Sequence, residues 1–243
     1  MKAASKNRRK FLQAGVAALV VGSLPSAARA AGAPGGKMKI GIVGSGRVGG
    51  TLGRVWANAG HQVMFSSIDL EHDRKLAAEV GANASAGTPR EAAKFGDVLV
   101  VSVPYHAMPA VGKDLGELLK GKIVLDTSNP IESRDGEIVK WAMEKGAGLA
   151  SAELLPGARI VRAFNAVGYM RMAEAAKSPS RMGMPIAGDD PKAIEVVSGL
   201  VRDIGYEPVL IGNLAMGRHL TPRQPLAGER SPDEVRKVAA TLK

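Results

Sequence analysis

The sequence of 243 residues contains no cysteine, which excludes disulfide bonds, thiolate nucleophiles and cysteine-ligated zinc. It has only four histidines, and no two of them stand at a metal-binding spacing such as H-x-x-x-H. We therefore predict no metal site and a fold that is stabilised by packing. The 45% hydrophobic content is that of an ordinary globular protein, and the length suits one domain with a modest extension.

Acidic residues are missing from the first 30 positions, which hold six lysines and arginines. Without these six charges the formal net charge falls from +10 to +4. In the remainder of the chain, basic and acidic residues are interspersed, as on a solvated surface. We predict no nucleic-acid partner, because no basic stripe that would follow a phosphate backbone is evident.

The first 30 residues have the three parts of a secretory signal: a charged stretch (residues 2–10), an apolar stretch (residues 11–24) and small residues after it. The apolar stretch is too short to span about 30 Å of hydrocarbon stably. Within the charged part, N-R-R-K-F-L-Q resembles the twin-arginine signal through Arg8 and Arg9. We therefore expect residues 1–30 to be a signal peptide that takes the folded protein through the twin-arginine export machinery to the periplasm.

Two other interpretations of this segment stay open. The apolar stretch would be an anchor if it were not cleaved. Translation from Met38, which directly precedes the first predicted strand, would instead give a complete cytoplasmic domain without a signal. Residues 31–37, A-G-A-P-G-G-K, are predicted to form a flexible linker.

From Met38 onward, M-K-I-G-I-V, G-S-G-R-V-G and T-L-G-R-V-W-A-N-A-G predict a buried strand, a tight turn and a helix. In this context Gly44 permits the turn, Gly46 lets the backbone approach a pyrophosphate, and Gly49 lets the helix pack closely on the strand. The N-terminus of the helix then faces the anion. The pattern predicts a dinucleotide site; the alternative is that the glycines merely close a loop.

The second predicted strand ends about 20 residues after the glycines, where an acidic residue normally binds the ribose 2′-hydroxyl of NAD. Here the chain has Ser66 and Ser67, whose hydroxyls leave room for a 2′-phosphate and can bind it. We therefore predict NADP rather than NAD, with Arg47 and Arg74 as candidate charge partners. Asp69 opposes this prediction, and serines that only terminate a strand are the alternative.

Strand and helix patterns continue to alternate, with further strands predicted at residues 97–103 and 122–127. They predict an α/β fold with a doubly wound, Rossmann-type, mostly parallel sheet over residues 38–165. A small C-terminal α/β extension over residues 166–243 is expected to complete the substrate pocket. Ligands of such sheets bind at the carboxyl ends of the strands. The residues expected in that crevice, if they are not merely loop residues, are Val103, Pro104, Tyr105, Asn129 and Pro130.

Five motifs carry a resemblance to a known family. They are M-K-I-G-I-V-G-S-G-R-V-G, the strand-end V-P-Y, D-T-S-N-P-I, E-L-L-P-G-A-R-I-V-R-A-F-N-A-V-G and G-D-D-P-K-A. Over residues 38–222 the chain resembles the NADP oxidoreductases that depend on the deazaflavin coenzyme F420, and related NADPH reductase domains. The resemblance implies that the pyrophosphate is held by Ser45, Gly46, Arg47 and Val48. It also implies that Ser66 and Ser67 approach the 2′-phosphate and that the residues near the nicotinamide are Val103, Pro130 and Asn165.

The chain departs from that family at two places. The family often follows its second-strand serine with arginine, whereas this chain has Ile68, which weakens the preference for NADP. Residues 218–230, R-H-L-T-P-R-Q-P-L-A-G-E-R, do not match a deazaflavin pocket, which puts the substrate in doubt.

The predicted chemistry is hydride transfer between NADP(H) and a small, flat redox co-substrate such as coenzyme F420 or a flavin. Such a transfer depends on positioning and needs no general acid, so we single out no catalytic residue. A non-catalytic NADP(H)-binding or redox-sensing module is the alternative. Near the C-terminus, Ser231 and Pro232 predict the start of a helix whose apolar stripe would pack on the domain or form a homodimer.

Overall fold

Eight strands form one sheet in the computed structural model, which describes residues 36–242. The predicted signal peptide and most of the predicted linker lie outside the described residues. The strands are β1 (Lys39–Val43), β2 (Gln62–Ser66), β3 (Ala84–Ala86), β4 (Val98–Val101), β5 (Ile123–Asp126), β6 (Arg159–Arg162), β7 (Gly183–Gly188) and β8 (Glu207–Gly212). Strands such as β4 and β5 are buried at every position because helices cover both faces of the sheet.

The strand order is β3-β2-β1-β4-β5-β6-β7-β8. All neighbours up to β6 are parallel, β6 and β7 are antiparallel, and β7 and β8 are parallel again. The chain therefore winds outward in both directions from the pair β1 and β4, which confirms the predicted doubly wound, mostly parallel fold. Because β7 is reversed, β7 and β8 begin at the edge where β1 to β6 end.

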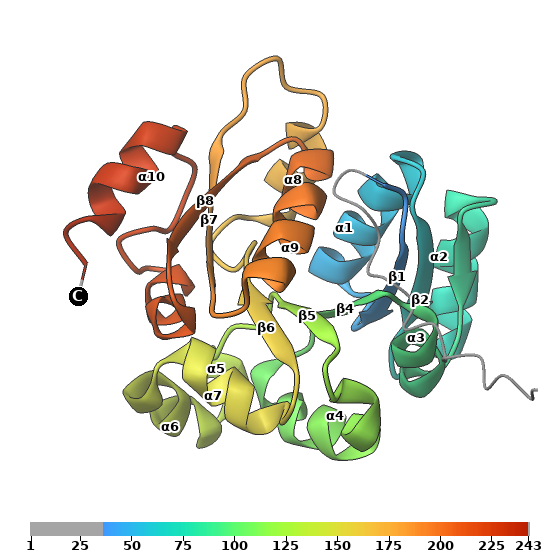
Figure 1. Cartoon of the computed structure of the whole chain (residues 1–243). Helices are drawn as coiled ribbons and strands as arrows, with labels where there is room; N and C mark the ends of the chain where they lie inside the picture. The colour runs from blue at the N-terminus through green and yellow to red at the C-terminus, as the bar shows by residue number, and fades with distance from the viewer. Residues whose placement is uncertain (1–35, 243) are drawn as a thin grey trace, which may run out of the picture. The chain divides into compact units, whose positions relative to one another are not determined.

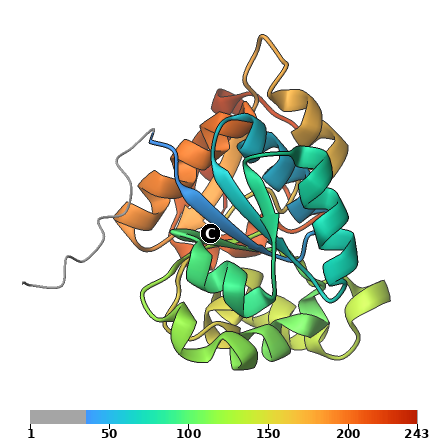
Figure 2. The ribbon, with the colours of Figure 1, turned by 90° about the vertical axis from the view of Figure 1, so that its right-hand side faces the viewer.

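Helices lie on both faces of the sheet (Figure 1). They are α1 (Arg47–Asn58), α2 (Leu70–Val80), α3 (Pro89–Phe95), α4 (Met108–Leu115), α5 (Glu132–Asp135), α6 (Ile138–Lys145), α7 (Ala147–Leu154), α8 (Tyr169–Ala175), α9 (Pro191–Ile204) and α10 (Pro232–Ala239), with short 3-10 helices η1 (Tyr105–Ala107), η2 (Gly116–Leu119) and η3 (Leu214–Leu220). Helices α1, α8 and α9 lie on one side of the central strands and α4 to α7 on the other, an arrangement that Figure 2 shows from a second direction.

The C-terminal part of the chain shares the core of the Rossmann part. Phe164, which follows β6, makes edge-to-face contacts with Trp56 of α1 and Tyr206 at the start of β8, with ring centroids 6.3 and 6.2 Å apart. The indole of Trp56 also donates a hydrogen bond to the carbonyl of Leu200 in α9, at 2.9 Å. Residues 166–242 thus extend one sheet and one core, so they hold their loops firmly against the carboxyl ends of β5 and β6.

The helices differ in how their first turns are capped. Thr88 and Ser231 each begin a helix with a capping box, as predicted for Ser231. Helix α1 instead begins at Gly46 with no side-chain cap and no acid in its first turn. No helix of the described residues is long and apolar enough to cross a membrane.

Candidate functional site

The turn between β1 and α1 is built by glycines that no other residue can replace without movement. Gly44 has φ of 98°, and a Cβ there would lie 2.3 Å from the carbonyl oxygen of Ser102. A Cβ on Gly49 would lie 2.2 Å from the carbonyl oxygen of Gly44. The two glycines therefore allow the first turn of α1 to pack directly against the end of β1.

Gly46 differs from these two, because a Cβ there would meet no atom within 4 Å. Its outer face is exposed, and the first amides of α1, those of Arg47 and Val48 among them, have no acceptor within the helix. Open space above unpaired amides at the positive end of a helix is the arrangement that binds a phosphate. The predicted pyrophosphate residues Ser45, Gly46, Arg47 and Val48 thus form one continuous turn.

The two serines at the end of β2, Ser66 and Ser67, have different surroundings. The Ser66 hydroxyl is buried and donates to the carbonyl of Ile42 at 2.6 Å, so it points into the sheet. The Ser67 hydroxyl donates to the carboxylate of Asp73, at 2.9 Å to Oδ2 and 3.1 Å to Oδ1. Ser45 donates to the same carboxylate, which links the glycine turn to the end of β2. Ile68, where the resembled family often has arginine, is fully exposed.

Asn165 joins the ends of β5 and β6. Its side-chain amide nitrogen donates to the backbone carbonyls of Asp126 and Ser128, at 3.2 and 3.3 Å. The backbone carbonyl of Asn165 accepts from the Asn129 side chain at 2.6 Å. These bonds fix which way the Asn165 amide faces. Its Oδ1 atom is buried and has no hydrogen-bond donor among the described residues. A buried oxygen of this kind requires a donor, so it is suited to receive an N–H group from a ligand.

A fully buried ion pair joins the ends of β5 and β6, where the loops that carry Asn129 and Asn165 begin. Arg162 of β6 contacts the carboxylate of Asp126 at the end of β5, and both side chains have no exposed surface. Arg162 also donates to the carbonyl of Ser128 at 2.9 Å. Beyond it, Phe164 has φ of 64°, an unusual value for an aromatic residue, and this bend turns the chain from β6 toward Asn165. The ion pair and the bend together position the loops that carry Asn129 and Asn165.

The residues after β4 divide between the crevice and the core. Val103 is half-buried, its amide donates to the Ser128 hydroxyl at 3.3 Å, and Pro104 is exposed beside it. Tyr105 was expected in the crevice, but it is fully buried and its hydroxyl donates to the carbonyl of Ala147 at 3.2 Å. Burial, with a smaller effect of the Asp126 charge, raises the pKa of Tyr105 to about 12, so it remains a neutral core residue.

A cleft of about 620 Å³ adjoins Pro130. One wall consists of Ile131 and, from α6, Val139 and Met143; residues 221–224 form the other wall. Ile131 and Met143 keep 37% and 41% of their surface exposed, an unusual exposure for large apolar side chains that share a cleft. Arg223 has φ of 71° and forms no ion pair with any residue of the described chain.

The loop that carries Pro130 and Ile131 into this cleft is held by Asp135. Its buried carboxylate accepts hydrogen bonds from Arg134, from His106 and from the amide of Ile131, at 2.8 to 2.9 Å. Burial alone would raise the pKa of Asp135, but these hydrogen bonds outweigh it and hold the pKa well below its usual range. The loop from Asn129 to Asp135 is therefore fixed by a permanently ionised group.

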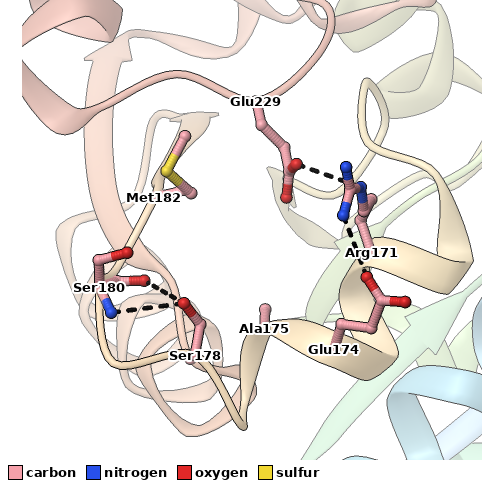
Figure 3. A pocket seen from close by; sticks show the side chains of 8 residues that line it. Arg171, Glu174, Ala175, Ser178, Ser180, Met182 and Glu229 are labelled. Carbon is pink, nitrogen blue, oxygen red and sulfur yellow. Dashed lines mark hydrogen bonds and ion pairs between the residues drawn. The ribbon is translucent and has the colours of Figure 1, made fainter.

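A second, smaller pocket of about 250 Å³ lies beside α8 (Figure 3). In it Arg171 contacts Glu174 at 3.1 Å and Glu229 at 3.3 Å, so the loop before α10 is fastened to α8. Burial, and next the charge of Glu229, raise the pKa of Tyr206 in the adjoining core. Because the arginine is already paired with two carboxylates, we interpret this pocket as a structural junction. No group of residues suited to a metal ion is present among residues 36–242.

Comparison with known proteins places this geometry in a family. Residues 39–130 match the family model described as NADP oxidoreductase, coenzyme F420-dependent. Over this segment the chain is similar to that family. The matched segment runs from β1 to Pro130, and so contains the glycine turn, the serines Ser66 and Ser67 at the end of β2, and the start of the cleft.

Two known proteins align over most of the chain. The F420-dependent NADP reductase of Methanothermobacter thermautotrophicus is 28% identical over 203 residues, which are 78% of this chain and 87% of that protein. Metalloreductase STEAP3 of Rattus norvegicus is 28% identical over 182 residues, and this chain spans only 35% of its length. The matches confirm the predicted family and the predicted class of enzyme, an NADP-dependent oxidoreductase.

The fold is also found among solved structures. The hypothetical protein SMa0349 from Sinorhizobium meliloti superposes with a TM-score of 0.68 at 24% identity, over 79% of this chain and 93% of that one. At this identity the likeness concerns the fold alone. It agrees with the doubly wound sheet described above.

Proposed function

We propose that the protein transfers a hydride between NADP(H), bound at the β1–α1 turn, and a flat redox co-substrate, such as a deazaflavin or a flavin, bound in the cleft beside Pro130. The observation that carries this proposal is the cleft itself. A protein that only bound or sensed the nucleotide would not need a second opening beside the nicotinamide residues. The partly exposed apolar side chains of Ile131 and Met143 on one of its walls suit an aromatic ring system.

The residues present fit the pyrophosphate and the nicotinamide of the nucleotide. The open face of Gly46 and the free amides of α1 are suited to the pyrophosphate. The unsatisfied Oδ1 of Asn165 is suited to accept a hydrogen bond from the carboxamide of the nicotinamide. When bound, the nicotinamide supplies or receives one proton and two electrons as hydride. Val103 and Pro130 would exclude water from the transfer, and no side chain is required to move a proton.

The test is NADPH oxidation by the purified protein with a deazaflavin, a flavin or a quinone as acceptor, followed by the loss of NADPH absorbance. We expect turnover with at least one flat acceptor. If NADPH binds tightly and none of these acceptors is reduced, the binding or sensing module is the correct interpretation instead.

A matched pair of substitutions locates the acceptor. Met143 in the cleft and Leu149 outside it are exposed to nearly the same extent, 41% and 40%. Met143→Arg should raise the KM for the acceptor by about tenfold, because it places a charge against the apolar ring face. Leu149→Arg should leave this KM unchanged, and neither substitution should alter the affinity for NADPH. Equal effects of the two substitutions would place the acceptor elsewhere.

For location in the cell, we propose export through the twin-arginine pathway, supported by Arg8, Arg9 and the charged, apolar and small-residue order of residues 1–30. Export of a folded protein would allow the nucleotide to be loaded before transport. Mass spectrometry of the protein recovered from its native compartment tests both points. A mature N-terminus close to residue 31 with retained nucleotide is expected, whereas a chain that begins at Met38 would favour the cytoplasm.

A further inference from the structure

We propose that Asp73 is a specificity-determining residue for the nucleotide, because its buried carboxylate fixes the direction of the Ser67 hydroxyl. In that direction Ser67 can accept a hydrogen bond from a ribose 2′-hydroxyl but cannot donate one to a 2′-phosphate. Asp73 therefore reduces the advantage of NADPH over NADH. This inference rests on the proposed function in one respect, the binding of the dinucleotide at the β1–α1 turn.

The contacts of Asp73 are unusual for a residue on the first turn of α2. It has no exposed surface, and its carboxylate accepts hydrogen bonds from Ser45 and Ser67. Within the described part of the chain no lysine, arginine or histidine forms an ion pair with it. A buried carboxylate without a cation depends on its hydrogen-bond donors, so both hydroxyl hydrogens are committed to Asp73.

The remaining capacity of Ser67 follows from counting its hydrogen and lone pairs. A serine hydroxyl has one hydrogen and two lone pairs. The hydrogen is directed to Asp73, whose Oδ2 at 2.9 Å is a nearer acceptor than the Asp69 carbonyl at 3.2 Å, and one lone pair accepts from the amide of Asp69 at 3.1 Å. One lone pair is left for a ligand. A ribose 2′-hydroxyl can donate to it, whereas a phosphate offers only acceptors and would have to displace Asp73.

Nearby cations do not compensate. Arg74 lies 3.7 Å from Glu71 of the same helix, and Arg47 lies over the ring of Tyr169, 5.8 Å from its centroid. Ile68 places an exposed aliphatic side chain next to Ser67. A phosphate at Ser67 would thus face the charge of Asp73 with no arginine contact already in place. Asp73 acts from a helix, through Ser67, much as an acid at a strand end acts on the ribose directly.

The experiment measures the Kd of NADPH and of NADH by titration calorimetry on the purified full chain. In Asp73→Asn, the amide of the new side chain can donate to Ser67 and so release its hydrogen toward a phosphate. The ratio of the NADH Kd to the NADPH Kd should rise about tenfold, the size expected for one hydrogen bond to a charged group. Glu79→Gln is the matched control, because it removes one negative charge from the exposed face of the same helix, where Glu79 contacts Arg54 at 3.0 Å. It should leave the ratio unchanged.

Ser67→Ala tests the direction of the hydrogen bond, and because it removes one of the two hydroxyl donors of Asp73, thermal unfolding first establishes that the variant is folded. If the proposal is correct, the loss of this acceptor weakens NADH more than NADPH, and Asp73→Asn no longer changes the ratio in the Ser67→Ala background. A larger loss for NADPH would show that Ser67 donates to the phosphate and would overturn the proposal. An unchanged ratio in folded Asp73→Asn would overturn it too. Failure of the wild-type protein to bind either dinucleotide would instead refute the proposed function.

Discussion

Two regions at the carboxyl edge of the sheet, one after β1 and one after β5 and β6, offer candidate ligand groups of different kinds. At the β1 end, the candidate groups are backbone amides and the space above Gly46, all within one turn of the sequence. At the β5 and β6 end, they are side chains brought from distant segments, such as Met143 and Arg223 around the cleft. The difference shows that a site made of backbone can be recognised from a short motif, whereas a site made of side chains becomes visible only after folding.

The largest loss of stability should come from breaking the ion pair that joins the ends of β5 and β6. Arg162→Met leaves the Asp126 carboxylate buried and unpaired, and should lower the free energy of unfolding by about 3–5 kcal/mol. Chemical denaturation measures this loss. Arg159→Met is the control, because the Arg159–Asp190 pair is partly exposed. A loss no larger than that of the control would mean that the fold at the ends of β5 and β6 does not depend on this ion pair.

Two substitutions in the glycine turn should separate the effect on stability from the effect on nucleotide binding. Gly49→Ala forces α1 away from β1 and should cost up to about 3 kcal/mol of stability, together with nucleotide binding. Gly46→Ala, at φ of −70° and with open space, should leave stability unchanged and still abolish tight NADPH binding. Thermal unfolding and NADPH titration distinguish the two. If Gly46→Ala bound NADPH normally, the backbone at this end would not contact the pyrophosphate.

A smaller, pH-dependent effect is expected at the cleft. The Asp135 carboxylate has a lowered pKa in the folded protein, so it stabilises the fold above its unfolded pKa of about 4 and loses this contribution as the pH falls below it. Asp135→Asn should therefore be less stable by about 1.5 kcal/mol at pH 7, and the difference should shrink in acid. Urea denaturation at several pH values from about 2 to 7 checks the sign of this pH dependence. A constant difference would exclude ionisation as the cause.

The smallest effect is expected from the cap of α10, a helix that lines neither of the two pockets described above. Ser231→Ala removes the capping box of α10 and should lower stability by about 1 kcal/mol. Affinity for NADPH and turnover of the acceptor should both be unchanged at a temperature where the variant is folded. Altered turnover would show that α10 belongs functionally with the side-chain end of the sheet.

Sequence reasoning predicted the elements whose signals are local. The strand, glycine turn and first helix were predicted correctly, as were the strands β4 and β5 and the capped helix that follows Ser231. Strand β3 was not predicted, because three small residues, Ala84 to Ala86, carry no periodic pattern. Helices α5, α6 and α7 were also missed: α5 has only four residues, and α7, A-G-L-A-S-A-E-L, has no marked apolar face.

The parts of the site that could not be predicted depend on contacts between distant residues. Asp73 meets Ser45 across 28 positions, and Arg162 meets Asp126 across 36. No spacing rule links such pairs before the sheet has formed. Tyr105 was placed at the crevice because its strand ends there, yet the turn of η1 directs its ring into the core between α4 and α7. The direction of a side chain after a strand end is decided by its neighbours in space.

One wall of the cleft proposed for the acceptor is formed by residues 221–224, which belong to no helix or strand. Residues 221–230 run between η3 and α10, and are tied down by a bond from the amide of Gly228 to the carbonyl of Ala166 and by the contact of Glu229 with Arg171. Their composition can change without a shift of strand register and without disturbing the glycine turn. Replacing residues 221–230 by the corresponding segment of a relative, with these two contacts kept, is therefore a direct way to change which acceptor the proposed enzyme reduces.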